Sequence, residues 1–338
     1  DVKEAVDQLA TVIQAERKPD EAVLLVSGHM FPVFNYYDAQ SPWFGLPDQP
    51  TLSVQKVLGY GVANDLNRIA KGRAGLWVLM WQDDIVDPNG ILTAILDTQA
   101  EPIAQPRSFW GVRLLHYRLP TGVVFSDAPK MQSPRRANFG GVIELLGYDQ
   151  RPSPADKGLD VTLYWRALKP PQDDYKVALR VRDATGREIG ALDQRPGSYN
   201  YPTTRWQTGE ALFGRFTIPL EPATPPGDYT LEVTLYTESS PEGLDVLDVA
   251  RNPAGKVVAL QPLRVDKALK TPLVADLKMK KPYQIVFGKD MEMLGFDLDR
   301  DRAEPGEPIQ VTGFWRALTA SRLDSNLTLA LGRRYGPP

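Results

Sequence analysis

An eight-residue block that occurs twice constrains the architecture of this chain more than any other feature. Residues 161–168 read VTLYWRAL, and residues 311–318 read VTGFWRAL. A second pair lies upstream of these blocks, with ELLGYD at 144–149 and EMLGFD at 292–297. The copies lie about 150 residues apart, which is the length of one compact domain and a linker. The sequence therefore predicts a repeated domain.

The second copy is followed by much less sequence than the first. About 100 residues of strand-like sequence follow Leu168, whereas 20 residues follow Leu318. We therefore expect the second copy to be incomplete and the chain to be a fragment of a longer protein. Three or so strands leave an apolar face open. We expect this piece to pack on the first copy, or to be completed by sequence outside the chain or by a partner.

Composition excludes several classes of function. The chain has 338 residues, of which 42% are hydrophobic, and this suffices for ordinary cores. Its 39 basic and 42 acidic residues give a net charge of −3, which argues against nucleic acid as a partner. Zero cysteines and only two histidines exclude disulfides, thiolate chemistry and a histidine-rich metal site. We expect no metal and no cofactor.

The first 120 residues alternate between helical and strand periodicity. Apolar runs such as AVLLV at 22–26 are typical of strands buried on both faces. The expected helices span 2–13, 58–69 and 87–96, and the expected strands span 22–26, 76–81 and 110–117. Repeated βα units predict a layered α/β domain with a mostly parallel sheet.

After this region the apolar residues recur with a period of two. Val177, Leu179 and Val181 alternate with polar residues, and turn signals separate such runs. This pattern predicts an all-β immunoglobulin-like sandwich with Trp165 in its core, and the start of a repeated sandwich with Trp315 at the equivalent place. The expected segments are 1–120 for the α/β domain, 121–139 for a linker, 140–266 for the first sandwich, 267–284 for a second linker and 285–338 for the incomplete second sandwich.

One turn of the α/β domain resembles part of an active site. Ser27 and His29 follow the first buried strand, while Asp83 and Asp84 follow the second. Because ligands bind beyond the carboxyl ends of strands in open α/β sheets, these four side chains could converge in a hydrolase or bind a ligand. The G-x-S-x-G elbow is missing and no glycine-rich phosphate loop is present, so loop capping is the competing interpretation. Asp83, Asp84 and Asp87 could also hold a hard cation, but helix capping and solvation are favoured over a metal site.

A polar and aromatic loop of the first sandwich is a second candidate site. Within residues 197–206, Tyr199, Tyr201 and Trp206 could stack on sugar rings. The alternative is a structural loop that covers the edge of the sandwich, and this alternative is favoured.

Several blocks together resemble a known family. They are AVLLVSGHMFP at 22–32, LWVLMW at 76–81, DPNG at 87–90, and the LLGYD and LYWRAL blocks of the sandwich. Their order is similar to the carboxyl-terminal soluble part of bacterial membrane glycosyltransferases of the dolichyl-phosphate-mannose protein mannosyltransferase group. In that family the catalytic acidic residues lie on loops between membrane helices, and the donor is a polyprenyl-phosphate sugar. The resemblance therefore implies no catalytic residue in this chain.

The resemblance also implies a location and partners. The chain would lie on the outer, cell-surface side of a bacterial membrane, anchored by segments that it does not contain. Its partners would be the membrane domain of the same protein and either a glycan or an acceptor protein. The first hypothesis is thus a non-catalytic extracytoplasmic region that positions the acceptor or supports the membrane domain. The alternative is a cell-surface adhesion or carbohydrate-binding protein of tandem β-sandwiches.

Overall fold

The computed structural model describes residues 1–151 and 153–319. The fold is mostly β-sheet and contains several sheets. The chain divides into two compact units, of which the first comprises residues 1–269 and the second begins at residue 270.

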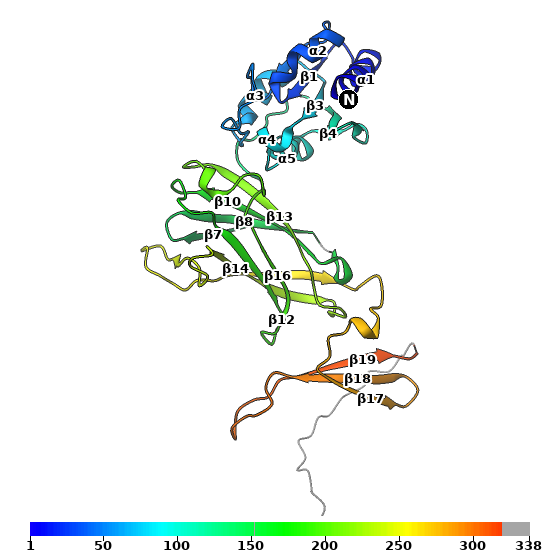
Figure 1. The fold of residues 1–338 in the computed structure, drawn as a ribbon, viewed down its shortest axis with the longest axis vertical. Coiled ribbons are helices and arrows are strands. Elements are labelled where there is room, and N and C mark those ends of the chain that lie inside the picture. The colour runs from blue at the N-terminus through cyan, green and yellow to red at the C-terminus, as the bar shows by residue number, and fades with distance from the viewer. Residues whose placement is uncertain (152, 320–338) are drawn as a thin grey trace, which may run out of the picture. The chain divides into compact units, whose positions relative to one another are not determined.

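A six-stranded sheet forms the first part of the first unit (Figure 1). Its central strands, β1 (Glu21–Val26) and β3 (Gly75–Trp81), run parallel, and β2 (Trp43–Gly45) is parallel to β1 on the other side. By contrast, β6 (Val112–Arg118) runs antiparallel to β3. Two short strands, β4 (Glu101–Pro102) and β5 (Arg107–Phe109), pair antiparallel with β6.

The sheet is therefore mixed, and the prediction of a mostly parallel sheet needs correction at β6. The physical reason is a tight turn between β5 and β6. Trp110 and Gly111 both have positive φ angles, 42° and 77°, and Phe109 pairs with Val112 across them. A two-residue turn of this kind folds a strand back as a hairpin instead of starting a parallel crossover.

Helices cover both faces of this sheet (Figure 1). Helix α1 (Val2–Glu16) begins with a capping box between Asp1 and Glu4, and packs with α2 (Phe31–Tyr37) on one face. The other face carries α3 (Val62–Ala70) and α5 (Ile91–Gln99). Successive residues of β1 point to opposite faces, and both faces are covered, so all six residues of β1 are buried.

Two five-stranded sheets form the sandwich-like remainder of the first unit (Figure 1). One sheet contains, in spatial order, β13 (Ala211–Ile218), β10 (Leu159–Ala167), β8 (Ile143–Arg151), β7 (Ser133–Phe139) and β15 (Val246–Leu247). The other contains β12 (Glu188–Gln194), β11 (Lys176–Arg182), β14 (Gly227–Tyr236), β16 (Val258–Asp266) and β9 (Ser153–Pro154). Trp165 is completely buried, which confirms its predicted place in the core.

Strand β7 lies within the segment 121–139 that the sequence predicted as a linker. Its last residue, Phe139, is fully buried and pairs with Ile143 of β8. Gly140 and Gly141 both adopt positive φ angles between the two strands, and this allows the tight hairpin. The connection that precedes the sandwich is therefore shorter than expected.

One cluster of buried apolar side chains extends from the α/β layer into the sandwich, while a separate cluster lies on the face of the sheet that α1 and α2 cover. The first cluster includes Leu66 of α3 and Ile95 of α5, and it continues to Trp165 and Leu179 in the two sheets of the sandwich. The α/β layer and the sandwich thus share a core, which agrees with the division of the chain after Leu269.

The described part of the second unit is a three-stranded antiparallel sheet of β17 (Lys281–Phe287), β18 (Met291–Leu298) and β19 (Val311–Ala317). Strand β17 begins within the predicted linker 267–284. Trp315 is only half-buried and lies 5.6 Å from the ring of Phe287. The expectation that Trp315 is a core residue is therefore wrong for this sheet, which leaves part of the ring uncovered.

The repeat in the sequence is also a repeat in strand pairing. Leu145 lies opposite Trp165 in the first copy, and Met293 lies opposite Trp315 in the second. Each copy also brings a glutamate near the arginine of its WRAL block (Glu144–Arg166 and Glu292–Arg316). Strands β17, β18 and β19 therefore correspond to β7, β8 and β10.

Four short 3₁₀ helices complete the described elements. They are η1 (Gly28–Met30), η2 (Ala155–Lys157), η3 (Thr203–Arg205) and η4 (Val274–Asp276). A four-residue helix, α4 (Asp83–Val86), follows β3.

Candidate functional site

The residues singled out after the two buried strands lie at the carboxyl ends of β1 and β3. The strand order β2-β1-β3 places the switch point of the sheet between β1 and β3, where ligands bind in open α/β sheets. Ser27 follows β1 directly, and His29 lies in η1. Asp83 and Asp84 begin α4, one residue after β3 ends at Trp81.

Ser27 joins the carboxyl ends of β1 and β3 through hydrogen bonds. It is completely buried, and both its backbone N–H and its hydroxyl donate to the carbonyl oxygen of Trp81, at 3.2 and 3.1 Å. A serine nucleophile must instead give its proton to a base such as histidine. The hydroxyl of Ser27 donates to a backbone carbonyl and not to a histidine. The geometry therefore does not support proton transfer from Ser27 to a base, which is the first step of serine hydrolysis.

His29 packs against an aromatic ring at the same edge. Its imidazole stacks on Trp81 with 5.3 Å between the ring centroids. Burial lowers the pKa of His29, so the imidazole is neutral at pH 7. No hydrogen bond joins His29 to Ser27 within the described ranges 1–151 and 153–319. The structure therefore brings the two residues to one turn without coupling them chemically.

The three nearby aspartates differ in their contacts. Asp83 accepts a hydrogen bond from Arg113 at 2.5 Å, and Asp84 is exposed. Asp87 is buried and accepts from the backbone N–H groups at the start of α5, from Ile91 at 2.7 Å and Leu92 at 3.1 Å. Across the residues that the structure describes, no three His, Asp or Glu side chains gather to hold a metal ion. Asp83 thus pairs with an arginine and Asp87 caps a helix.

The sandwich loop predicted to stack on sugars is largely buried. Tyr201 and Trp206 are 4% and 0% exposed, and the indole N–H of Trp206 donates to the carbonyl oxygen of Tyr201 at 3.3 Å. Neither ring can present a face to a sugar, so this prediction is corrected for both. The alternation of polar and aromatic residues does not reveal that the loop folds inward. Only Tyr199 is exposed, and the guanidinium of Arg195 lies 4.8 Å from its ring centroid.

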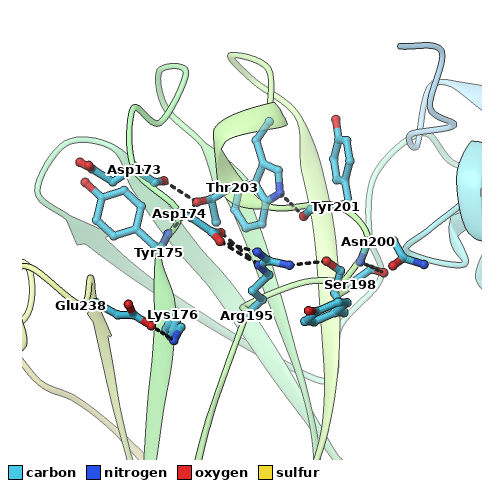
Figure 2. Close-up of polar contacts among 12 residues, drawn as sticks. Asp173, Asp174, Tyr175, Lys176, Arg195, Ser198, Asn200, Tyr201, Thr203 and Glu238 are labelled. Atoms are coloured by element: carbon cyan, nitrogen blue, oxygen red, sulfur yellow. Dashed lines mark hydrogen bonds and ion pairs between the residues drawn. The ribbon is translucent and has the colours of Figure 1, made fainter. Parts of the chain in front are cut away.

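Polar contacts hold this loop on the strand edge (Figure 2). Arg195 donates to both oxygens of Asp174, at 3.2 and 2.5 Å, and also to the carbonyl oxygen of Tyr199. These bonds raise the pKa of the Arg195 guanidinium, which is therefore charged. Thr203 accepts from the backbone N–H of Tyr175 at 2.8 Å and donates to the carbonyl oxygen of Asp173 at 2.7 Å. These bonds attach the loop to residues 173–175.

The same loop contacts the α/β layer. The backbone N–H of Ser198 donates to Oδ1 of Asn89 at 3.0 Å, and Arg205 donates to the carbonyl oxygen of Val54. A Cβ atom on Gly197 would lie 3.1 Å from Oδ1 of Asn89, so glycine permits this close approach. Two motifs that sequence reasoning treated separately, DPNG and the sandwich loop, therefore meet.

A cavity of about 500 Å³ lies within the first unit. Its walls come from α5, the segment 128–132 and the outward face of β8, β10 and β13. The residues with polar side chains that line it are Tyr60, Asp97, Thr98, Gln99, Lys130, Gln132, Asp149, Arg151, Asp160, Thr162, Tyr164, Arg215 and Thr217. Sequence reasoning missed this site because its residues are spread over more than 150 positions, and the only signal was that Asp149 and Tyr164 lie in the repeated blocks.

The phenols of this cavity are neutral. Burial raises the pKa of both Tyr60 and Tyr164 well above the usual value. The hydroxyl of Tyr164 donates to Oδ2 of Asp149 at 2.7 Å, and the backbone N–H of Gln132 donates to its Oδ1 at 2.5 Å. Asp149 is therefore an ordered carboxylate whose oxygens are both occupied.

Two comparisons with known proteins found no match. No protein-family model matches the chain, and no curated protein matches it. Among residues 1–151 and 153–319, no helix is both long and apolar enough to cross a membrane.

Proposed function

We propose that this chain is a non-catalytic extracytoplasmic region of a membrane-bound glycosyltransferase that uses a lipid-linked sugar donor. It positions the acceptor or supports the membrane domain, and it lies on the cell-surface side of a bacterial membrane. The blocks at 22–32, 76–81, 87–90 and in the sandwich support this proposal. An immunoglobulin-like topology of the sandwich and the α/β character of the layered domain belong to the same proposal.

The observation that carries the proposal is the use of Ser27 in a structural contact. Its hydroxyl bonds to the carbonyl of Trp81, and Asp83 bonds to Arg113. The residues best suited to catalysis thereby hold the sheet edge together. A support role agrees with this, as does the core shared by the α/β layer and the sandwich.

Two measurements test this proposal. The first is to sequence the full reading frame that encodes the chain. We expect it to encode membrane-spanning segments before residue 1, with acidic residues in a loop on the outer side of the membrane. A frame with a signal peptide at that place and further sandwiches after residue 338 would overturn the proposal. The second assays the purified chain for hydrolysis of glycosides and esters. We expect no activity; hydrolysis that Ser27→Ala abolishes would also overturn it.

A second candidate is a cell-surface adhesion or carbohydrate-binding protein of tandem sandwiches. The observation that favours it is the shared strand pairing of the two copies, in which Trp165 and Trp315 lie opposite equivalent residues. Tandem copies of one sandwich are typical of extended surface proteins. Binding of the chain to whole cells or to a glycan array, together with further repeats in the reading frame, would support this function.

A further inference from the structure

The cavity of the first unit is lined by two cross-strand rows of polar residues. Asp160 of β10 lies opposite Arg151 of β8 and Thr217 of β13. Thr162, two residues further along, lies opposite Asp149 and Arg215. Since side chains with this spacing point to the same face of a sheet, each row presents a carboxylate, a guanidinium and a hydroxyl to the cavity.

The cations of the cavity have no carboxylate partner. Within the described ranges, Lys130, Arg151 and Arg215 form no ion pair, although three aspartates line the same cavity. Arg215 is held instead over the ring of Phe213, 4.9 Å from its centroid. All three cations are exposed. They are therefore available to an anionic group of a ligand.

The carboxylates of the cavity are bonded to neutral donors. Oδ1 of Asp160 accepts from the hydroxyl of Thr217 at 2.6 Å, and Oδ1 of Asp97 accepts from the hydroxyl of Tyr117 at 2.7 Å. The other oxygen of each carboxylate accepts no hydrogen bond from the described part of the chain. Each can therefore accept a hydrogen bond from a hydroxyl group of a ligand.

The sandwich itself does not require these polar residues. In the second copy, which has the same strand pairing, Phe314 stands at the position of Tyr164, Gln310 at that of Asp160 and Asp299 at that of Arg151. The strands thus form with other residues at these positions. Lys278, Asp297 and Thr312 stand at the positions of Lys130, Asp149 and Thr162, so the second copy keeps part of the polar set and lacks Asp160, Arg151 and Tyr164.

We propose that this cavity binds an acidic sugar, a monosaccharide unit that carries a carboxylate. Arg151, Arg215 and Lys130 bind the carboxylate, while Asp160 and Asp97 accept hydrogen bonds from ring hydroxyls. The volume of about 500 Å³ falls within the range of about 300–1,000 Å³ that is usual for ligand pockets. A simple anion would leave the aspartates unused, and a neutral sugar would leave the cations unused. The inference goes beyond the proposed function. The chain has this cavity whether it belongs to a glycosyltransferase or to an adhesion protein.

Isothermal titration of the whole chain with D-glucuronate, D-glucose and acetate tests this inference. We expect saturable binding of glucuronate, at least about tenfold tighter than that of glucose or acetate, because only glucuronate uses both kinds of group. Arg215→Gln and Asp160→Asn should each weaken glucuronate binding at least about tenfold. Arg264→Gln is the matched control, because Arg264 is an exposed arginine of the other sheet that does not line the cavity. It should leave binding unchanged.

Four outcomes would overturn the inference. They are equal affinity for acetate, equal affinity for glucose, no saturable binding of glucuronate, or binding that neither cavity variant changes. Circular dichroism spectra check that each variant is folded. If Arg215→Gln fails to fold, Lys130→Gln replaces it, because Lys130 lies outside the strands. The same loss of glucuronate binding is then expected.

Discussion

Asn89 and Ser198 lie 109 residues apart in the sequence and are joined by a hydrogen bond of 3.0 Å. Asn89 is buried in the turn before α5, and Ser198 belongs to the loop between β12 and β13. The bond links the α/β layer to the sandwich at a point where Gly197 allows the two loops to approach closely. It belongs to a polar junction that complements the shared apolar core.

Replacing Asn89 with alanine should weaken this junction. The N–H of Ser198 would lose its partner, so we expect the free energy of unfolding to fall by roughly 1–2 kcal/mol. Urea denaturation followed by tryptophan fluorescence measures this change. Asn64→Ala is the control, because Asn64 is exposed on α3, and it should leave stability unchanged or slightly higher. Equal effects of the two substitutions would contradict the role given to Asn89.

Trp206 should behave as a core residue and Tyr199 as a surface residue. Trp206 is completely buried, and we expect Trp206→Phe to lower the free energy of unfolding by about 1–3 kcal/mol through the cavity it leaves. Tyr199 is 81% exposed, so Tyr199→Ala should change the free energy of unfolding by no more than about 0.5 kcal/mol. Thermal and urea unfolding of both variants provide the comparison. A Trp206→Phe variant as stable as the parent would show that this loop does not fold inward.

Asp87 should make stability depend on pH. Burial raises the pKa of its carboxyl to about 7, well above that of an aspartate in an unfolded chain, which is about 3.9. Between these values the folded state binds more protons than the unfolded state, so stability decreases as the pH rises from about 4 to about 7. Asn can still cap a helix but does not titrate.

Urea denaturation of the parent and of Asp87→Asn, at about pH 5 and about pH 8, isolates this effect. The stability of the parent relative to the variant should be greater at the lower pH. A difference that is constant, or that grows at the higher pH, would show that the carboxyl is already ionised in the folded protein at the lower pH.

The first unit should fold without the second. Leu269 donates its backbone N–H to Asp156 at 2.8 Å, so residues up to 269 have contacts within the first unit. We expect a variant that ends at Leu269 to unfold at the same urea concentration as the first unit of the longer chain. The fluorescence of the buried tryptophans of the first unit, Trp77, Trp165 and Trp206, is the readout. A clearly lower midpoint would mean that the second unit stabilises the first.

The sequence predicted most reliably those features that depend on local periodicity. The alternation of Val177, Leu179 and Val181 became a strand with these three side chains buried, and Trp165 became a core residue. The direction of β6 was not predictable in this way. It depends on a turn at Trp110 and Gly111 that lacks the usual Asn-Gly or Gly-Gly pair.

Features that depend on distant contacts were harder to predict. Tyr201 and Trp206 have the composition of a surface loop, and only the packing of the sandwich shows that both are buried. Ser27 and Asp83 reached one edge of the sheet as expected, but their hydrogen bonds go to Trp81 and Arg113 and not to each other. The cavity could not be predicted from the sequence either, because each of its walls comes from a different element.

The apolar cluster that runs from α5 into both sheets also limits how such a chain can change over evolution. A larger or smaller side chain at Ile95 alters the space available to residues of the sandwich, and not only to its own layer. Recombination that exchanged the α/β layer alone would therefore bring together halves whose surfaces do not match. The two layers are expected to be inherited as a single block, whatever sequences flank them.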